Sequence, residues 1–232
     1  GTTEYLFFLS QKEPRLKRTK TGNSNRMMAG KKFPLTLGLK AAANELVVLT
    51  DADCYPATNQ WLKQVVSGYA TDDKAIVLGY GAYEKKPGRL NRRIRYETFL
   101  TALNYLSFAL AKLPYMGVGR NLSYQKGLFF STNGFFDHRQ IPSGDDDLFI
   151  NKVATKKNTE IVISPDAFTY SPPKETREEW IEQKTRHMST ARYYRAKHKF
   201  WLALQPISHI LFWVTSLYLL ATVFVYWYIV AA

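Results

Sequence analysis

Cysteine is almost absent from this sequence, which carries a single thiol at Cys54. One cysteine excludes an internal disulfide framework and a cysteine-rich zinc site. Acidic residues are also few, since 19 Asp and Glu face 32 Lys and Arg and leave a formal net charge of +13. No helix-turn-helix, zinc-finger or RNA-binding pattern accompanies this charge, so we expect no nucleic-acid partner.

A signal-peptide pattern is missing at the N-terminal end, whereas the C-terminal end is a long apolar run. The 23 residues Ile210–Ala232 include no charged side chain. As a helix they measure about 35 Å, enough for a hydrocarbon core of about 30 Å. A buried core helix is the alternative, but such helices seldom lack charge over this length. We therefore expect a transmembrane helix over residues 207–232.

Basic side chains precede this apolar run. They are Lys184, Arg186, Arg192, Arg195, Lys197 and Lys199. Positive charge beside a membrane span stays on the cytosolic side, and anionic headgroups attract it. We therefore expect the protein in the inner or plasma membrane, with residues 1–200 forming one cytosolic domain.

Within residues 1–200, helical and extended patterns alternate. The compact apolar run Glu45–Thr50 favours a buried parallel strand. Helical patterns flank it over Phe33–Ala43 and Gln60–Tyr69, and a second buried strand comes next over Ala75–Tyr80. This alternation predicts an α/β fold with an open, mostly parallel sheet and helices on both faces.

Two short elements are expected earlier in the chain, a helix over Thr3–Gln11 and a strand over Arg15–Thr21. A longer helix is expected over Leu90–Leu113, ended by Pro114. Its apolar residues recur at helical spacing and four arginines crowd its start. Such a helix either packs into the core or lies on a membrane surface with its arginines towards the headgroups.

A further helix is expected over Thr176–Tyr194, because Thr176 and Glu179 form a capping box. It carries Gln183, Arg186 and His187 at helical spacing, so these side chains form one patch. An arginine there can neutralise a phosphate leaving group, whereas a solvated basic face near the membrane is the plainer interpretation.

The strongest candidate for chemistry is the pair Asp51 and Asp53, which comes directly after the apolar run Glu45–Thr50. Open α/β sheets bind ligands at this end of their strands. Alternate residues of an extended segment point the same way, so both carboxylates can approach one Mg²⁺ or Mn²⁺. The alternative is a helix cap or a loop acid, and Cys54 is then a small neighbour.

A second acidic cluster, Asp145–Asp147, comes after Ser143 and Gly144. Placed at a helix start, these carboxylates gain from the helix dipole, and crowding raises their pKa values towards those of a general base. A solvated acidic helix start is the alternative. The loop Gly117–Tyr124 has two glycines, which suits either a backbone that approaches a ligand or a plain turn.

Taken in order, these motifs resemble those of the membrane-associated family 2 glycosyltransferases, which include cellulose and hyaluronan synthases. Gly30–Ala42 is similar to the Gly-Lys helix of that family, and Asp51-x-Asp53 matches its D-x-D motif. Gly119–Tyr124, with Gly134-Phe135 after it, resembles the acceptor segment. Ser143–Leu148 matches the place of the E-D motif, and Gln183-x-x-Arg186-His187 resembles Q-x-x-R-W.

The resemblance implies a GT-A-type fold, inverting transfer from a nucleotide-sugar donor and a divalent metal. The roles that it implies are these: Asp53 and Asp51 on the metal; Lys31, Lys32, Gln183, Arg186 and His187 on the donor; Gly119, Arg120 and Asn121 on the acceptor; and Asp145 or Asp146 as the base. The spacing to Leu148 favours Asp145. His187 stands where processive synthases have Trp, which argues against processive polymerisation. Gly1–Leu6 resembles the segment directly after the family's first acidic motif, so the first strands, which hold the nucleotide base, are expected to be missing.

The function expected from this resemblance is the transfer of a sugar from a UDP-sugar to a glycan or lipid-linked acceptor at the cytosolic membrane face. Such a reaction serves cell-envelope or extracellular glycan synthesis. The alternative is a non-catalytic membrane-tethered module that keeps the fold. Both carboxylate clusters are present, and a decayed module is not expected to keep them.

Overall fold

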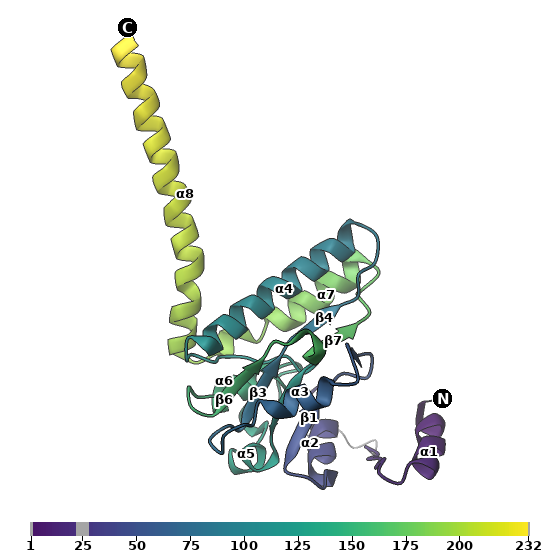
Figure 1. Ribbon diagram of the computed structural model, residues 1–232. Coiled ribbons are helices and arrows are strands. Elements are labelled where there is room, and N and C mark those ends of the chain that lie inside the picture. Colours follow the sequence, from purple (N-terminus) through teal and green to yellow (C-terminus); the bar gives the residue numbers. More distant parts are fainter. Residues whose placement is uncertain (1, 22–27, 232) are drawn as a thin grey trace. The chain divides into compact units, whose positions relative to one another are not determined.

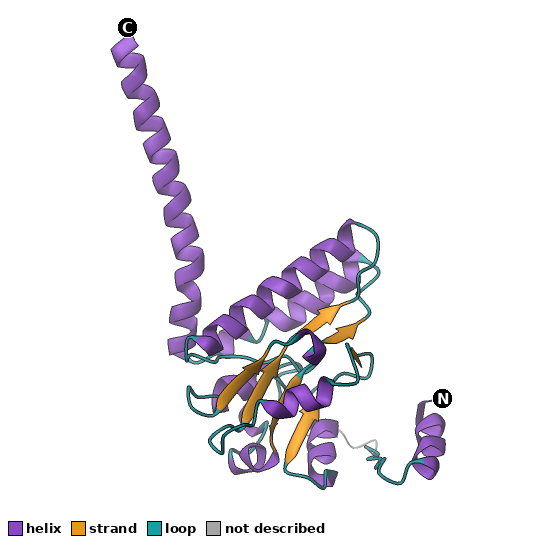
Figure 2. Ribbon diagram, in the orientation of Figure 1, coloured by secondary structure: helices purple, strands orange, loops and turns teal. Residues whose placement is uncertain are grey.

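The computed structural model describes residues 2–21 and 28–231; the outermost residues of two expected segments, Gly1 and Ala232, lie outside this part. The chain divides into two compact units, Gly1–Tyr193 and Tyr194–Ala232. The first is a mixed α/β unit, and the second is dominated by one helix (Figures 1 and 2).

A four-stranded sheet forms the centre of the first unit. Its strands are β1 (Leu46–Leu49), β5 (Leu122–Gln125), β3 (Ile76–Gly79) and β6 (Thr159–Val162), in the order β1-β5-β3-β6. β5 is antiparallel to both β1 and β3, whereas β3 and β6 are parallel. The expected strands at β1 and β3 are confirmed. Three of the four strands, β1, β3 and β6, run in one direction, which agrees with the expected mostly parallel sheet, and β5 is the one reversed strand.

The first unit also contains a second sheet, which has three strands. It consists of β2 (Tyr55–Pro56), β7 (Thr169–Ser171) and β4 (Gly81–Tyr83), in the order β2-β7-β4. β7 is antiparallel to β2 and parallel to β4. The turn with Asp51 and Asp53 connects β1 to β2, so it leads from one sheet to the other.

Helices surround these sheets (Figure 2). The helices of the first unit are α1 (Thr2–Lys12), α2 (Lys32–Ala41), α3 (Trp61–Ser67), α4 (Arg89–Leu110), α5 (Lys126–Ser131), α6 (Asp147–Val153) and α7 (Arg177–Met188). Short 3₁₀ turns cover Phe136–His138, Pro165–Ala167 and Ala191–Tyr193. The five helices expected from sequence are confirmed. The strand expected over Arg15–Thr21 was wrong, because turn and irregular backbone fill this stretch and Leu16 is its one apolar side chain to bury.

The core is apolar and aromatic. The β3 residues Ile76, Val77 and Leu78 are at most 1% exposed. On one side Val77 packs with Val65 of α3 and with Val162 of β6. Helix α4 anchors through Tyr105, whose hydroxyl donates to the carbonyl oxygen of Gly79 at 2.6 Å. The sheet thus holds the two helices that flank it in fixed positions.

Helix α7 begins as expected and ends earlier. The Thr176 hydroxyl accepts from the Glu179 N–H at 3.3 Å, which confirms the cap. The helix ends at Met188 instead of Tyr194, because Thr190 turns inwards and is 1% exposed. α7 lies beside α4 (Figure 1), joined by an ion pair of 2.9 Å between Lys184 and Glu97.

The second unit contains α8 (Ala196–Ala231), a helix of 36 residues with Pro206 inside it. Within the described residues it is the one helix long and apolar enough, by length and composition, to cross a membrane. Its candidate span covers Ala196–Phe224 and therefore begins before residue 207, because the helix continues through Lys197 and Lys199.

Candidate functional site

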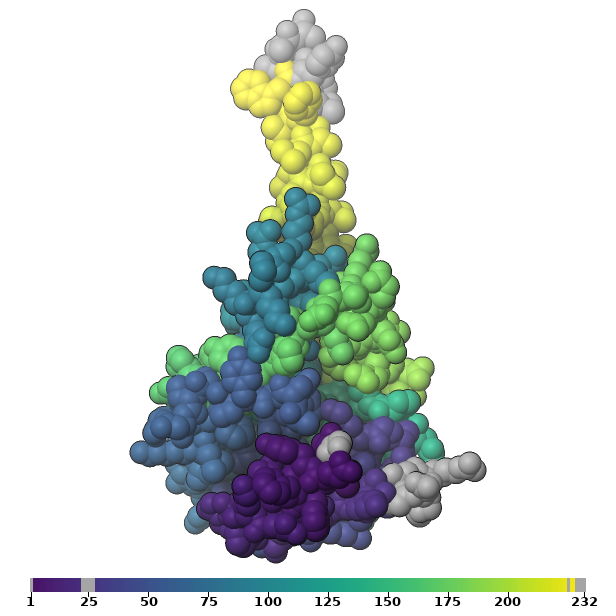
Figure 3. All heavy atoms as spheres, turned by 90° about the vertical axis from the view of Figure 1, so that its right-hand side faces the viewer, coloured from purple at the N-terminus to yellow at the C-terminus, as the bar shows by residue number. Residues whose placement is uncertain are grey.

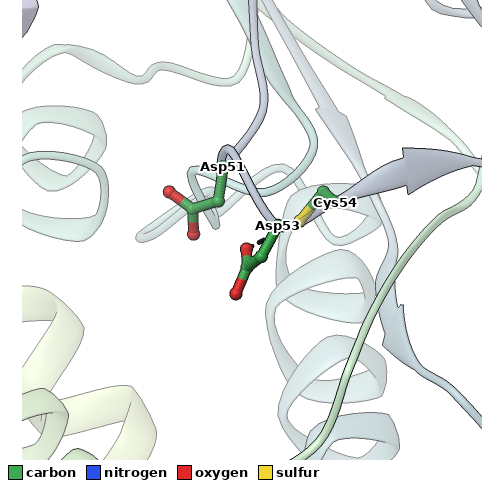
Figure 4. A group of neighbouring side chains, drawn as sticks. All are labelled: Asp51, Asp53 and Cys54. Carbon is green, nitrogen blue, oxygen red and sulfur yellow. Dashed lines mark hydrogen bonds between the residues drawn. The ribbon is translucent and has the colours of Figure 1, made fainter. Parts of the chain in front are cut away.

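The turn after β1 gathers three potential metal ligands. The N–H of Cys54 donates to the carbonyl oxygen of Asp51 at 3.0 Å and closes the turn. One ligand atom each from Asp51, Asp53 and Cys54 lies within 4.8 Å of the others. Figure 4 shows both carboxylates on the same side of the turn, with the thiol beyond Asp53. The two acids are therefore brought together by a turn, and the expectation of an extended D-x-D segment was wrong.

The donor set fits a hard cation through its oxygens. Carboxylates are the ligands that Mg²⁺ and Mn²⁺ prefer. Burial raises the pKa of the Cys54 thiol, and the charges of Asp53 and Asp51 act in the same direction. The thiol therefore stays protonated at neutral pH, and a protonated thiol is a poor metal ligand. Asp51 and Asp53 are the residues here that could hold a divalent cation.

Lys31 lies beside this pair. Its ammonium donates to Oδ1 of Asp51 at 2.6 Å. Partial burial would lower the pKa of Lys31, but the hydrogen bond and charge of Asp51, together with the charges of Asp145 and Asp146, outweigh it and raise the pKa. The carboxylates of both acidic clusters therefore stabilise the positive charge of Lys31.

Gly30 allows this approach. Its φ is +64°, and a Cβ at this position would lie 2.2 Å from the carbonyl oxygen of Pro142. Only glycine combines that backbone conformation with so close a neighbour. The Gly30-Lys31-Lys32 stretch therefore brings the start of α2 against the loop that leads to Asp145.

Lys32 has a different role from its neighbour. The residue is 0% exposed. Its ammonium donates to the carbonyl oxygens of Ile141 at 2.5 Å and of Ser143 at 2.6 Å. Burial lowers the pKa of Lys32, and the charges of Asp145, Asp147 and Asp146 oppose this shift. Lys32 therefore fixes the loop 141–143. Its buried ammonium is not exposed to a ligand that binds from solvent.

Asp146 is held by two backbone N–H groups. Its Oδ2 accepts from Gly119 and its Oδ1 from Asp147, each at 2.8 Å. It is the N-cap of α6, as expected for acids at a helix start. Burial, with the charge of Asp147, raises the pKa of Asp146 to about 6 although these hydrogen bonds oppose the shift. Burial and the charge of Asp146 also raise the pKa of Asp145.

Asp147 has a structural role. It is 7% exposed and accepts from the hydroxyl of Thr190, which is itself buried. Thr190 also donates to the carbonyl oxygen of His187 at 2.8 Å. This contact joins the start of α6 to the end of α7. Sequence reasoning missed Thr190, since a threonine after a helix end carries no distinguishing signal.

The glycine loop supports the second cluster. Arg120 lies over the ring of Tyr83 at 4.3 Å and donates to Oγ of Ser171 at 3.0 Å. Asn121 is 1% exposed. Its amide nitrogen donates to the carbonyl oxygens of Tyr80 and Ala167 at 3.0 and 2.7 Å. Its buried amide therefore joins backbone segments, whereas Gly119 reaches Asp146.

The α7 patch reaches the same region. Gln183 exchanges hydrogen bonds with the Tyr83 hydroxyl at 3.2 and 3.4 Å. Arg186 and His187 are exposed. Desolvation by surrounding atoms, followed by the charges of Arg186 and Arg120, lowers the pKa of His187 to about 4. At neutral pH the imidazole is therefore neutral beside a fixed positive charge.

By sequence, no protein-family model and no curated protein matches the chain. Among solved structures, the mannosyltransferase PcManGT from Pyrobaculum calidifontis, in complex with GDP-Man and Mn²⁺, is similar with a TM-score of 0.54 at 22% identity. The match covers 78% of this chain and 47% of that one. The two proteins share a fold.

TarS residues 1–349 from S. aureus is also similar, with a TM-score of 0.48 at 16% identity over 74% of this chain and 48% of that chain. The chain thus spans about half the length of the solved structures that it matches.

Proposed function

We propose that this chain carries the catalytic site of a membrane-associated, inverting family 2 glycosyltransferase. The observation that carries the proposal is that residues 30–32 contact both the turn with Asp51 and the loop 141–143, which leads to Asp145 and Asp146. Lys31 binds Asp51 at 2.6 Å, and both later acids act on its pKa. The fold shared with a mannosyltransferase that was solved with GDP-Man and Mn²⁺ supports the same conclusion.

The donor in this proposal is a nucleotide diphosphate sugar, held at the turn after β1. Asp53 and Asp51 would hold Mg²⁺ or Mn²⁺ there. Such a cation, when bound, lowers the negative charge on the donor diphosphate and makes it a better leaving group. Lys31 and the exposed Arg186 supply positive charge for the departing diphosphate. We take UDP-sugars as the first candidates, and the GDP-sugar of the structural neighbour as the second.

Asp146 is the base in this proposal. A carboxylate with a pKa of about 6 is ionised at neutral pH and basic enough to receive a proton. The acceptor hydroxyl gives its proton to Asp146, and its oxygen forms a bond to the anomeric carbon. The bond from that carbon to the diphosphate oxygen breaks, and the electron pair leaves with the diphosphate. Attack opposite to the leaving group inverts the anomeric centre.

Positioning residues complete the site. Gly119 orients Asp146 through its N–H, and Lys32 fixes the loop that precedes Asp145. Asn121 joins the surrounding backbone. The acceptor is a glycan or a lipid-linked sugar at the cytosolic membrane face. Gly119 is the residue of the acceptor segment that contacts the proposed base.

The test is a donor screen with the full-length protein in membranes. Release of nucleoside diphosphate is measured from UDP- and GDP-sugars, with Mn²⁺, Mg²⁺ or a chelator. We expect Asp53→Asn to abolish cation-dependent donor binding, because an amide is a far poorer ligand for a hard cation. Asp146→Asn should retain donor binding and lower turnover by about 10²-fold or more.

Asp72→Asn is the matched control, since Asp72 lies on an exposed turn. Its donor binding and turnover should equal those of the wild type. If the wild type binds a donor but turns over none of those screened, the chain is a non-catalytic module. Unchanged cation-dependent binding in Asp53→Asn would remove the metal assignment.

A further inference from the structure

Helix α4 has two apolar faces, and only one of them is buried. Ile94, Ala102 and Tyr105 face the sheet and are at most 4% exposed. The opposite face exposes five large apolar side chains: Tyr96 at 62%, Phe99 at 51%, Leu100 at 41%, Leu103 at 52% and Leu110 at 60%. At 100° per residue, these five lie within about 60° of Tyr96. We call them the outer face of α4.

Arginines extend the outer face at its N-terminal end. Arg89, Arg92 and Arg93 are exposed and fall within the same arc of the helix. The one acid of α4, Glu97, lies about 100° from Tyr96. It is engaged by Arg93 at 3.3 Å and by Lys184 at 2.9 Å. The outer face therefore combines apolar side chains with positive charge and carries no acid.

The outer face is also accessible within its own unit. α4 lies on the outside of the first unit in Figure 1, and its side chains stand out from that unit in Figure 3. Soluble monomeric proteins rarely expose contiguous apolar patches of this kind without a partner. A surface of adjacent aromatic, aliphatic and arginine side chains needs an occupant that is both apolar and anionic.

We propose that the outer face of α4 lies on an anionic lipid bilayer. Its aromatic and leucine side chains would enter the boundary between headgroups and acyl chains, and Arg89 and Arg92 would contact lipid phosphates. A second copy of the chain fits less well, because self-pairing of this face gives its arginines no carboxylate to meet. The surface is a membrane contact in addition to any span formed by α8, and it does not depend on the proposed reaction.

The test places a fluorescent label on the outer face of the full chain. In a Cys54→Ser background, Leu103→Cys carries an environment-sensitive dye, and Lys63→Cys, exposed on α3, carries the same dye as the control. Both proteins are placed in nanodiscs that contain phosphatidylglycerol and a nitroxide-labelled lipid. We expect nitroxide quenching at position 103 to exceed that at position 63 by at least about threefold, as for a helix within the interface.

Two further measurements distinguish lipid from a protein partner as the cause of shielding at position 103. Arg89→Glu with Arg92→Glu should reduce quenching at position 103 to the level at position 63, and discs of phosphatidylcholine alone should weaken it. Equal quenching at the two positions in anionic discs overturns the proposal. A dye that is shielded at position 103 equally well in lipid-free amphipol, and is not quenched by the nitroxide, shows a protein partner and also overturns it. Unchanged thermal melting confirms that the labelled variants are folded.

Discussion

Asp146 combines a raised pKa with a fixed orientation. Each of its carboxylate oxygens accepts a backbone N–H, from Gly119 or from Asp147. Hydrogen bonds to a carboxylate lower its pKa, yet burial and the neighbouring charge of Asp147 raise it to about 6. The group is therefore ionised at pH 7 and still close to the pKa that suits proton transfer.

The rate of transfer should track the ionisation of Asp146. Only the ionised carboxylate can receive the acceptor proton, so kcat/KM should rise with pH through about 6 and level off above it. At pH 5 we expect about a tenth of the plateau value, one pH unit below the pKa. The measurement is a pH profile of initial rates at saturating divalent cation.

Asp145→Asn serves as the control for this profile. The variant should keep the rise near pH 6, although its midpoint shifts down because a neighbouring negative charge is removed. A profile that is flat from pH 5 to 8 contradicts the assignment. Loss of the pH dependence in Asp145→Asn alone would transfer the role of base to Asp145.

Two adjacent lysines at the start of α2 have different roles. Lys31 is largely exposed and forms an ion pair with Asp51. Lys32 is 0% exposed and binds two carbonyl oxygens of the loop 141–143. The sequence shows two adjacent lysines, and only the direction in which the chain enters α2 distinguishes them.

We expect Lys32→Met to destabilise the protein by about 2–4 kcal/mol, because two carbonyl oxygens lose their donor. Lys31→Met should change the free energy of unfolding by less than about 1 kcal/mol, since it removes an exposed ion pair. It should instead weaken donor binding. Urea denaturation and donor titration of both variants provide the measurements. Equal destabilisation by the two substitutions would contradict the assignment of a structural role to Lys32 and a binding role to Lys31.

The fold was predictable where local patterns carry it. The apolar run before Asp51 and the cap formed by Thr176 located β1 and the start of α7, because burial and capping leave local signals. β2, β4 and β7 have two or three residues each, too few to show a period. The reversed strand β5 was not predicted, because its partner β1 lies more than 70 residues away along the chain.

The candidate site was also predictable only in part. The acids at 51, 53, 145 and 146 were identified from sequence, because carboxylates grouped after a strand or at a helix start are conspicuous. The side chains that position other residues of the site were not identified. Thr190, Tyr83 and Ser171 are ordinary residues until the fold brings them to Asp147, Gln183 and Arg120. A contact across the fold depends on packing that no local pattern encodes.

Charged and apolar residues are distributed along the chain in a way that suits a membrane surface. The net charge is +13, and basic residues precede α8 in the chain. From residue 200 onwards the sequence has no Asp, Glu, Lys or Arg. A helix of 36 residues is about 54 Å long, which exceeds the hydrocarbon thickness of about 30 Å. Part of α8 can therefore lie outside the bilayer while the rest crosses it.

The topology expected from these properties can be tested on the full chain. In a Cys54→Ser background, one cysteine replaces Thr71, on an exposed turn of the first unit, or is added in a tag after residue 232. If α8 crosses the membrane, a membrane-impermeant maleimide added to sealed inside-out vesicles should label position 71 and leave the tag unlabelled. Detergent should expose both sites equally, which controls for reactivity. Labelling of both in intact vesicles would mean that α8 lies along the interface, and labelling of the tag alone would reverse the orientation set by the basic residues before α8.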